Sequence, residues 1–307
     1  MKNKKALGNL ILLVTAFIWG ASFVSQRVGM DRIEPFTFNA VRMLISALAM
    51  ALIIAIRDRV QLSRGSHPSQ TMSAGEYSSW KRNAVKGGLA CGVVLALASI
   101  SQQVGMVYTT AGKAGFITAL YILIVPVISV IFLKKKVGWL SWIAVAIGAV
   151  GLYLLSINED FTIARGDLYV MICALCFSFH ILVIDRYVNE TDPLRISMIQ
   201  FCVAAAISGA AALLFEEPTG DKIMSAMVPI LYCALIAGAG GYTMQMIGQK
   251  YTEPTVASLI MSLESAFALL TGMLFLNERL SGRELAGCAI MFAAIILIQI
   301  PMPGKRA

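Results

Sequence analysis

The chain of 307 residues is too apolar for a soluble domain, because 58% of its residues are hydrophobic and 14% are charged, whereas charged residues make up about a quarter of an ordinary globular protein. This composition argues against a water-soluble enzyme and predicts an all-α integral membrane protein. The formal net charge of +8 is weak evidence for nucleic-acid binding, since no basic stretch is interleaved with aromatic residues as a single-strand binder requires.

Ten apolar stretches follow one another along the chain, each close to the ~20 residues that a helix needs to cross a bilayer. Lys2, Lys4 and Lys5 precede the first stretch, as in a signal peptide, but no small-residue cleavage site follows it. We therefore interpret the first stretch as a membrane helix. We expect spanning helices over residues 8–28, 36–56, 85–107, 114–133, 138–156, 167–187, 194–214, 228–249, 256–276 and 284–301.

The basic residues predict the orientation of the chain. Lys134, Lys135 and Lys136 follow the fourth stretch, and Lys305 and Arg306 follow the tenth. Because Lys and Arg are retained on the cytoplasmic side of a membrane, ten spans with both termini in the cytoplasm place most basic residues inside. We expect a multi-pass protein of a bacterial plasma membrane, in contact with lipid and without a nucleic-acid partner.

The sequence contains an internal repeat. Residues 102–136 align with residues 245–279 without a gap, at an offset of 143 positions. Upstream, residues 9–48 align with residues 167–206 at an offset of 158 positions. A repeat of this length indicates that the fold is built from two similar units.

Each copy contains five of the expected spans. An odd number of crossings returns the second copy to the membrane upside down, so the sequence predicts two inverted five-helix repeats, residues 1–157 and 158–307. Halves related in this way can exchange conformations around a central site near the bilayer midplane, which is the physical basis of alternating access.

Short motifs in this order resemble a known family. They are Trp19–Phe23 (WGASF) in the first expected helix, Arg42 in the second, Tyr108–Gly112 (YTTAG) before the fourth and Leu276–Ser281 (LNERLS) after the ninth. Order, spacing and duplication together resemble the drug/metabolite transporter superfamily, in its EamA branch of ten-helix carriers. The resemblance covers essentially the whole chain and implies a secondary transporter with a central substrate site.

Glu264 is the strongest candidate for that site. It lies near the middle of the ninth expected span, where a charged side chain costs roughly 2.5 to 3.5 kcal/mol. The carboxyl group must therefore face a wet cavity, pair with a cation or hold a proton, and it is a candidate for proton coupling. Tyr121 in the fourth span corresponds to Glu264 at the 143-residue offset and is a second candidate. A structural carboxyl group bonded to neighbouring helices is the alternative interpretation.

Two further repeat-related pairs are candidates for substrate binding. Gln102 corresponds to Gln245, and their amide groups suit neutral polar groups of a solute, unless they bond between helices. Trp19 corresponds to Phe177, and the two rings are expected either to form an aromatic wall of the site or to pack ordinarily.

The last candidate pair is Ser22 in the first span and His180 in the sixth. His180 is a candidate for proton coupling, because an unperturbed histidine changes charge near neutral pH, or else it hydrogen-bonds between helices. Arg42 must snorkel, meet a carboxylate or contact substrate, and we interpret it as a structural ion pair or lipid contact.

Glycine and proline mark candidate hinges. Gly240 and Gly241 end a run of small residues in the eighth expected span and are expected to make it bendable. Pro126 in the fourth span removes one backbone hydrogen bond and is expected to kink that helix.

No cofactor or metal site is predicted. All six cysteines lie within expected spans and are interpreted as packing residues, because the C-x-x-C spacing of Cys173 and Cys176 lacks further ligands. Gly112 and Lys113 lack the spacing of a nucleotide-binding loop, so transport is expected to draw on gradients rather than on ATP.

The pattern favours transport of small polar metabolites, amino acids or related compounds, by alternating access, as export with or without proton coupling. Carriers of organic cations, drugs or nucleobase-like solutes are the main alternative. A membrane acyltransferase is a remote one, since His180 and Asp185 have an H-x-x-x-x-D spacing. Five residues of a helix turn about 500°, which places these two side chains on different faces, so we expect no enzyme. The oligomeric state, monomer or homodimer, stays open.

Overall fold

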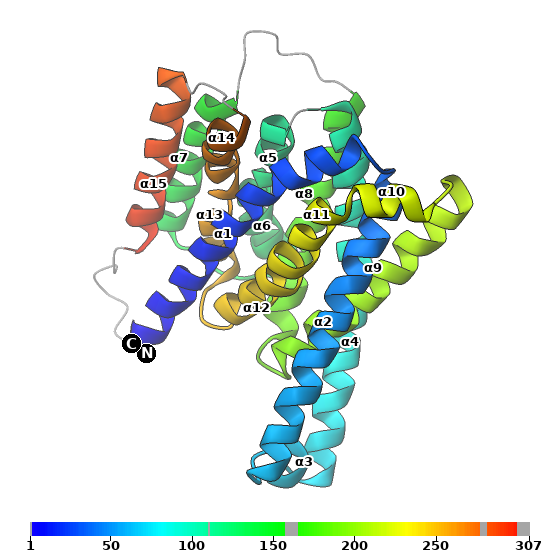
Figure 1. The fold of residues 1–307 in the computed structure, drawn as a ribbon. Helices are drawn as coiled ribbons and strands as arrows, with labels where there is room; N and C mark the ends of the chain where they lie inside the picture. The colour runs from blue at the N-terminus through cyan, green and yellow to red at the C-terminus, as the bar shows by residue number, and fades with distance from the viewer. Residues whose placement is uncertain (1, 110, 157–164, 277–280, 300–307) are drawn as a thin grey trace.

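The computed structural model describes residues 2–109, 111–156, 165–276 and 281–299, and every regular element among them is a helix (Figure 1). The first half contains α1 (Lys2–Met30), α2 (Pro35–Ser63), α3 (Pro68–Thr71), α4 (Ala74–Tyr108), α5 (Ala111–Ala119), α6 (Tyr121–Ile131) and α7 (Trp139–Ser156). The second contains α8 (Arg165–Tyr187), α9 (Pro193–Phe215), α10 (Gly220–Ser225), α11 (Met227–Leu231), the π-helix η1 (Tyr232–Tyr242), α12 (Thr243–Gln249), α13 (Pro254–Met261), α14 (Glu264–Leu276) and α15 (Gly282–Gln299).

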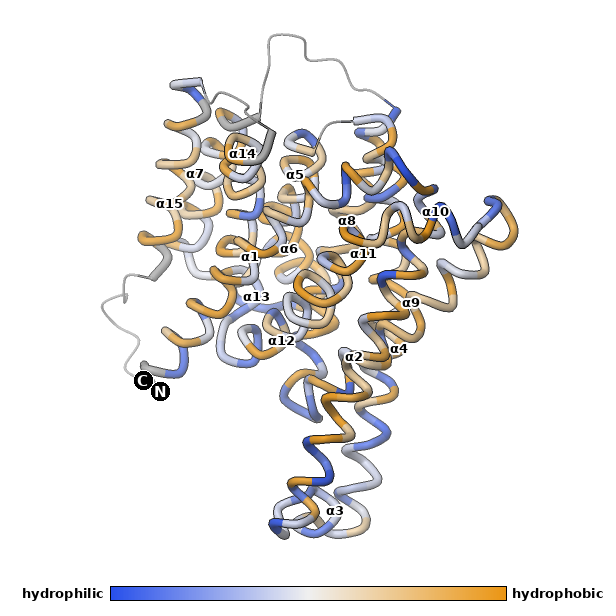
Figure 2. Tube along the Cα trace, in the orientation of Figure 1, coloured by the Kyte–Doolittle hydropathy of each residue, from blue (hydrophilic) through white to orange (hydrophobic). Residues whose placement is uncertain are grey.

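The prediction of an all-α membrane protein is confirmed. Eight helical stretches of the described chain are long and apolar enough to cross a membrane, and two shorter apolar helices, Trp139–Leu154 and Leu285–Leu297, accompany them. Figure 2 shows apolar residues along the bodies of these helices and hydrophilic ones mainly at their ends. The expected repeat boundary at 157/158, Thr110 and residues 277–280 of the LNERLS motif lie outside the described residues.

Glycine residues lie where helices pack most closely. The α4 helix packs against α8 and α9, and a Cβ atom added at Gly88 or Gly92 would lie 2.5 or 2.6 Å from the side chains of Ile199 and Val203. The α7 helix packs against α15, where a Cβ atom at Gly151 would lie 2.8 Å from the carbonyl oxygen of Gly287. Glycine thus allows close approach of backbones, as small residues do between membrane helices.

Two of the expected spans are interrupted at matching positions. Residues 114–133 form α5 and α6, which are separated at Leu120, and residues 256–276 form α13 and α14, which are separated at Ser262 and Leu263. At each break a leucine N–H bonds three residues back, from Leu120 to Ile117 O (3.2 Å) and from Leu263 to Ile260 O (3.3 Å). The two leucines are 143 positions apart, so the interruption itself follows the sequence repeat.

The break in the fourth expected span is not at the proline. Pro126 lies inside α6, and the helix continues through it. The interruption instead precedes Tyr121, where the tighter three-residue turn at Leu120 ends α5. The interruption at Leu120 was not expected from the sequence, and the kink expected at Pro126 stays a prediction.

The eighth expected span contains an unusual stretch. Between α11 and α12, the 11 residues of η1 have π-helical hydrogen bonding. Such hydrogen bonding is rare in proteins, and where it occurs it is frequently at a functional site. Gly240 and Gly241 lie in this stretch.

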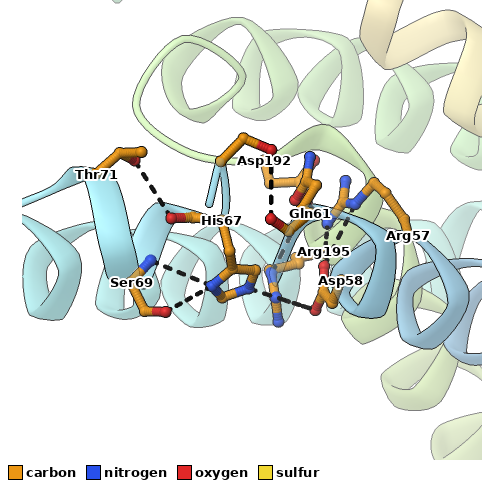
Figure 3. A network of polar contacts seen from close by, with 9 residues as sticks. Arg57, Asp58, Gln61, His67, Ser69, Thr71, Asp192 and Arg195 are labelled. Carbon is orange, nitrogen blue, oxygen red and sulfur yellow. Dashed lines mark hydrogen bonds and ion pairs between the residues drawn. The ribbon is translucent and has the colours of Figure 1, made fainter. Parts of the chain in front are cut away.

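The polar region from Arg57 to Arg82 is largely helical rather than a simple connection. The α2 and α4 helices extend into it and are joined through α3, forming a hairpin that projects from the bundle (Figure 1). Ion pairs fasten this hairpin to the start of α9, with Arg57 2.5 Å from Asp192 and Arg195 2.5 Å from Asp58 (Figure 3). His67 lies beside the same network and caps α3 by accepting from the Ser69 N–H.

Candidate substrate-binding site

The two residues that follow the helix breaks meet in the interior. Tyr121 is the first residue of α6, and Glu264 is the first residue of α14. Their side chains are 2% and 3% exposed, and the Tyr121 hydroxyl donates a hydrogen bond of 2.9 Å to Oε1 of Glu264. The repeat-related pair named from sequence is therefore a direct contact between the halves.

This contact forms part of the wall of a cavity of ≈ 30 Å³. Seven of the eight substrate-binding candidates line it: Trp19, Ser22, Gln102, Tyr121, Phe177, Gln245 and Glu264. A cavity of this size admits one or two water molecules and is too small for an amino acid. Binding of a solute therefore requires the helices around it to separate.

The paired glutamines differ in their partners. Gln102 donates through Nε2 to the Thr118 hydroxyl at 3.1 Å, which supports an interhelical role as well as a cavity-lining one. Gln245 is 1% exposed, and its Oε1 atom has no hydrogen-bond partner in the described part of the chain. A buried acceptor without a partner is unfavourable by roughly 1–3 kcal/mol, so Gln245 offers a free acceptor at the cavity.

The aromatic side of the cavity includes Trp19, Phe177 and Tyr242. The Trp19 Nε1 atom donates to the carbonyl oxygen of Ala237 in η1 at 3.0 Å, and the Trp19 and Tyr242 rings lie 4.8 Å apart. The sequence analysis missed Tyr242, whose counterpart at the 143-residue offset is Ser99, because a single tyrosine within an apolar span has no distinctive sequence signal.

Ser22 and His180 have structural partners. Ser22 donates to the carbonyl oxygen of Trp19 at 2.7 Å and accepts from Gln26 at 3.2 Å. His180 does not line the cavity. It is fully buried, its Nε2 atom lies 3.0 Å from Oε1 of Gln200, and its ring packs edge-on against Tyr242. The structure thus supports the interhelical alternative for His180, and its part in proton coupling stays a prediction.

Arg42 contradicts the preferred interpretation from sequence. It is 6% exposed, lines the cavity and takes part in none of the ion pairs found among the described residues. Its Nε atom donates to Asn39 Oδ1 at 2.9 Å and its Nη1 atom to Gln26 Oε1 at 3.2 Å. Its burial argues against a lipid contact, and among the described residues its partners are amides rather than carboxylates. The sequence analysis missed Asn39 and Gln26 as these partners.

The candidate hinge glycines are packed to different degrees. A Cβ atom at Gly241 would lie 2.6 Å from Trp19 Nε1, whereas one at Gly240 would lie 3.4 Å from the Leu235 carbonyl oxygen. Gly241 therefore allows the indole to approach η1. Bending at either glycine, or at Pro126, stays a prediction.

Comparisons with known proteins place the chain in a family. The sequence profile of the EamA-like transporter family matches residues 6–157 and 164–300. An uncharacterized transporter of Archaeoglobus fulgidus is 28% identical over 297 residues, which cover 97% of this chain and 87% of that protein. The threonine/homoserine exporter RhtA of Salmonella typhimurium is 26% identical over 176 residues, 55% of this chain and 58% of that one.

The fold is also similar to a solved one. A crystal structure superposes with a TM-score of 0.68 over 95% of this chain and 97% of its own, at 17% sequence identity. Since the family profile covers nearly all of the sequence in two stretches, the chain belongs to the EamA-like transporter family.

Proposed function

We propose that the protein exports small polar metabolites, amino acids and related compounds, by alternating access between two inverted repeats. In this proposal the repeats are residues 1–157 and 158–307, both termini are cytoplasmic, and the membrane is a bacterial plasma membrane. Glu264 binds either the cationic group of the substrate or a coupling proton. The observation that carries the proposal is the hydrogen bond between Tyr121 and Glu264 at the two matching helix breaks.

The chemistry of this contact supports transport. A carboxyl group inside a membrane protein is costly and usually marks a substrate or ion pathway. Interrupted helices are typical of the sites at which transporters hold substrates and coupling ions. Here the carboxyl group, the breaks and the cavity coincide.

The polar groups around the cavity suit a solute that donates hydrogen bonds. Glu264 and Gln245, whose Oε1 atom is unpaired in the described part of the chain, both line the cavity, and both can receive an ammonium or hydroxyl group. The name of the similar Salmonella protein, a threonine/homoserine exporter, agrees with such a solute.

Glu264→Gln tests the proposal directly. Purified protein in liposomes should move a solute from a panel of amino acids, organic cations and nucleobases. We expect the variant to lose about 10- to 100-fold in flux, as fits the loss of charge-assisted hydrogen bonds, and to lose the pH dependence if Glu264 carries the coupling proton.

Glu253→Gln is the matched control, because Glu253 is exposed at the start of α13 and undergoes the same chemical change outside the cavity. Near-wild-type flux and pH dependence in a folded Glu264→Gln protein would contradict the role of Glu264. If the wild-type protein moves organic cations or nucleobases and no amino acid, the substrate part of the proposal is wrong.

A further inference from the structure

The cavity holds a buried positive charge that the mechanism above does not use. Arg42 lines the same cavity as Glu264, yet no described carboxylate lies within 4.0 Å of its guanidinium group. An arginine carries its charge at any physiological pH, and a buried ion without a counter-charge is costly. The Arg42 guanidinium group and the Glu264 carboxyl group therefore line one cavity without forming an ion pair with each other.

Neutral side chains hold Arg42 in place. The two described acceptors, on Asn39 and Gln26, are amide oxygens and carry no charge. Asn39 is itself fixed by donating to the hydroxyls of Ser99 (3.0 Å) and Ser208 (2.7 Å). This chain of contacts orients the guanidinium group from α1, α2, α4 and α9 without neutralising it. An arrangement that fixes a charge and leaves it uncompensated is suited to a ligand that brings the opposite charge.

We propose that Arg42 binds the carboxylate of the substrate while Glu264 receives its ammonium group, so that the site selects zwitterions. This inference rests on the proposed function and narrows its substrate class to compounds with both groups, such as α-amino acids. A guanidinium group matches a carboxylate with two parallel hydrogen bonds. An organic cation would satisfy Glu264 and leave Arg42 uncompensated.

The same observations disfavour a phosphorylated solute. Among the described residues, Arg42 is the one lysine or arginine that lines the cavity. Lys113 does not line the cavity and is held 2.6 Å from Asp167. A phosphate group of charge near −2 beside Glu264 would therefore meet a single cation.

The test compares solutes that differ in one charged group. Wild-type protein in liposomes is assayed for flux of the common L-amino acids, then of the carboxamide and N-acetyl derivatives of the amino acid moved fastest. We expect the parent amino acid to be preferred over each derivative by about 10- to 100-fold, the effect of losing hydrogen bonds between charged groups. If the carboxamide is moved as fast as the amino acid, the assignment of Arg42 is wrong, whatever any variant does.

Variants identify the group responsible. In Arg42→Gln the amino acid and its carboxamide should be moved at nearly equal rates. Arg42→Lys keeps the positive charge but loses the two parallel hydrogen bonds of the guanidinium group, so its preference for the amino acid should lie between those of Arg42→Gln and wild type. Arg186→Gln is the matched control, because Arg186 near the end of α8 is exposed and pairs with Glu190 in the turn that follows, and it should keep the wild-type preference. A purely structural Arg42 would lower both fluxes by one factor and leave the preference unchanged, which would overturn the inference.

The two proposals fail in different ways. A protein that moves no solute of any class contradicts the proposed function and this inference together. A protein that moves solutes, but does not distinguish a carboxylate from a carboxamide, contradicts only the role of Arg42. If Arg42→Gln does not fold, the wild-type comparison and Arg42→Lys still decide the question.

Discussion

The two interrupted helices, α5–α6 and α13–α14, share a backbone geometry and differ in chemistry. Each is broken at a leucine whose N–H bonds three residues back. The next residue is a tyrosine in one half and a glutamate in the other, and the two are hydrogen-bonded. Equivalent positions of the sequence repeat thus share the helix break, and they differ in that only the second carries an acidic residue.

The flanking helices show the same contrast. At the 143-residue offset, Gly240 and Gly241 correspond to Leu97 and Ala98, which lie in the uninterrupted α-helix α4. The glycines lie in the π-helix η1, against which Trp19 packs. Symmetry in sequence therefore does not extend to the hydrogen bonding of every pair of helices, and the departures border the cavity.

Exchanging the two central residues tests whether the two helix breaks are equivalent in function. Glu264→Tyr alone should lose about 100-fold in flux, because the carboxylate and its charge-assisted bonds are gone. Adding Tyr121→Glu returns a carboxylate to the equivalent break and should recover a substantial part of the flux in liposomes. A folded double variant as inactive as the single one would show that the two breaks are not interchangeable.

Gly241→Ala tests the close packing of η1. Its Cβ atom would lie 2.6 Å from Trp19 Nε1, so we expect a loss of about 1–3 kcal/mol in stability from overpacking, seen as a lower melting temperature in detergent. Gly240→Ala is the matched control, since its nearest atom is at 3.4 Å. Equal losses in the two variants would point to backbone conformation rather than to the indole contact.

The two ends of the α2–α9 pair give a third comparison, at the offset of 158. Glu216 accepts from the backbone N–H groups of Phe36 (2.8 Å) and Thr37 (2.7 Å) at the start of α2. The equivalent Asp58 instead accepts from the side chain of Arg195 at the start of α9. One helix end is capped by a carboxylate from another helix, and the other is fastened by an ion-pair network (Figure 3).

Glu216→Gln should therefore cost more stability than Asp58→Asn. The backbone donors of α2 have no alternative acceptor of equal strength, so we expect a loss of about 1–2 kcal/mol. Arg57 keeps its contact with Asp192 when Asp58 is neutralised, and a loss below about 1 kcal/mol is expected there. Chemical denaturation in detergent measures both, and the reverse order would contradict this explanation.

The smallest effect is expected at the contact between Glu34 and Lys222. The Lys222 ammonium group, through its hydrogen bond, holds the pKa of Glu34 below its usual range. A depressed carboxyl pKa contributes stability above the unfolded-state pKa, and that contribution is lost as pH falls through the folded-state value. Lys222→Gln should thus melt slightly lower than wild type at neutral pH. The difference should shrink as pH falls below about 4, the ordinary carboxyl pKa, and vanish once Glu34 is protonated in the folded protein. A difference that persists in acid would indicate another cause.

The membrane fold and the central pair of residues could be predicted from the sequence, because they depend on composition and on the offset of the internal repeat. The apolar spans predict the membrane fold, and the offset pairs Tyr121 with Glu264 before any contact is known. The helix breaks could not be predicted from the sequence. Hydropathy gives the length of an apolar run, and it does not tell whether a backbone N–H bonds to the carbonyl group three or four residues back. Proline is the residue that a sequence offers as a helix breaker, yet α6 continues through Pro126 and the interruption lies at Leu120.

Arg42 shows a second limit. A lone arginine in an apolar span has the same sequence signature whether it snorkels or faces the interior. The direction depends on how the helix is rotated against its neighbours, which is set by packing partners far along the chain, such as Ser99 and Ser208 around Asn39. Likewise, the unpaired oxygen of Gln245 becomes visible only when every neighbour is placed.

The projecting hairpin of α2, α3 and α4 has a practical consequence for imaging. At 1.5 Å per residue, the 29 residues of α2 extend to roughly 43 Å, beyond the ~30 Å of a hydrocarbon core. A detergent micelle or nanodisc would therefore leave the tip uncovered. A nanobody raised against this tip would give electron microscopy an alignment feature on an otherwise membrane-embedded particle, and would do so without touching the cavity.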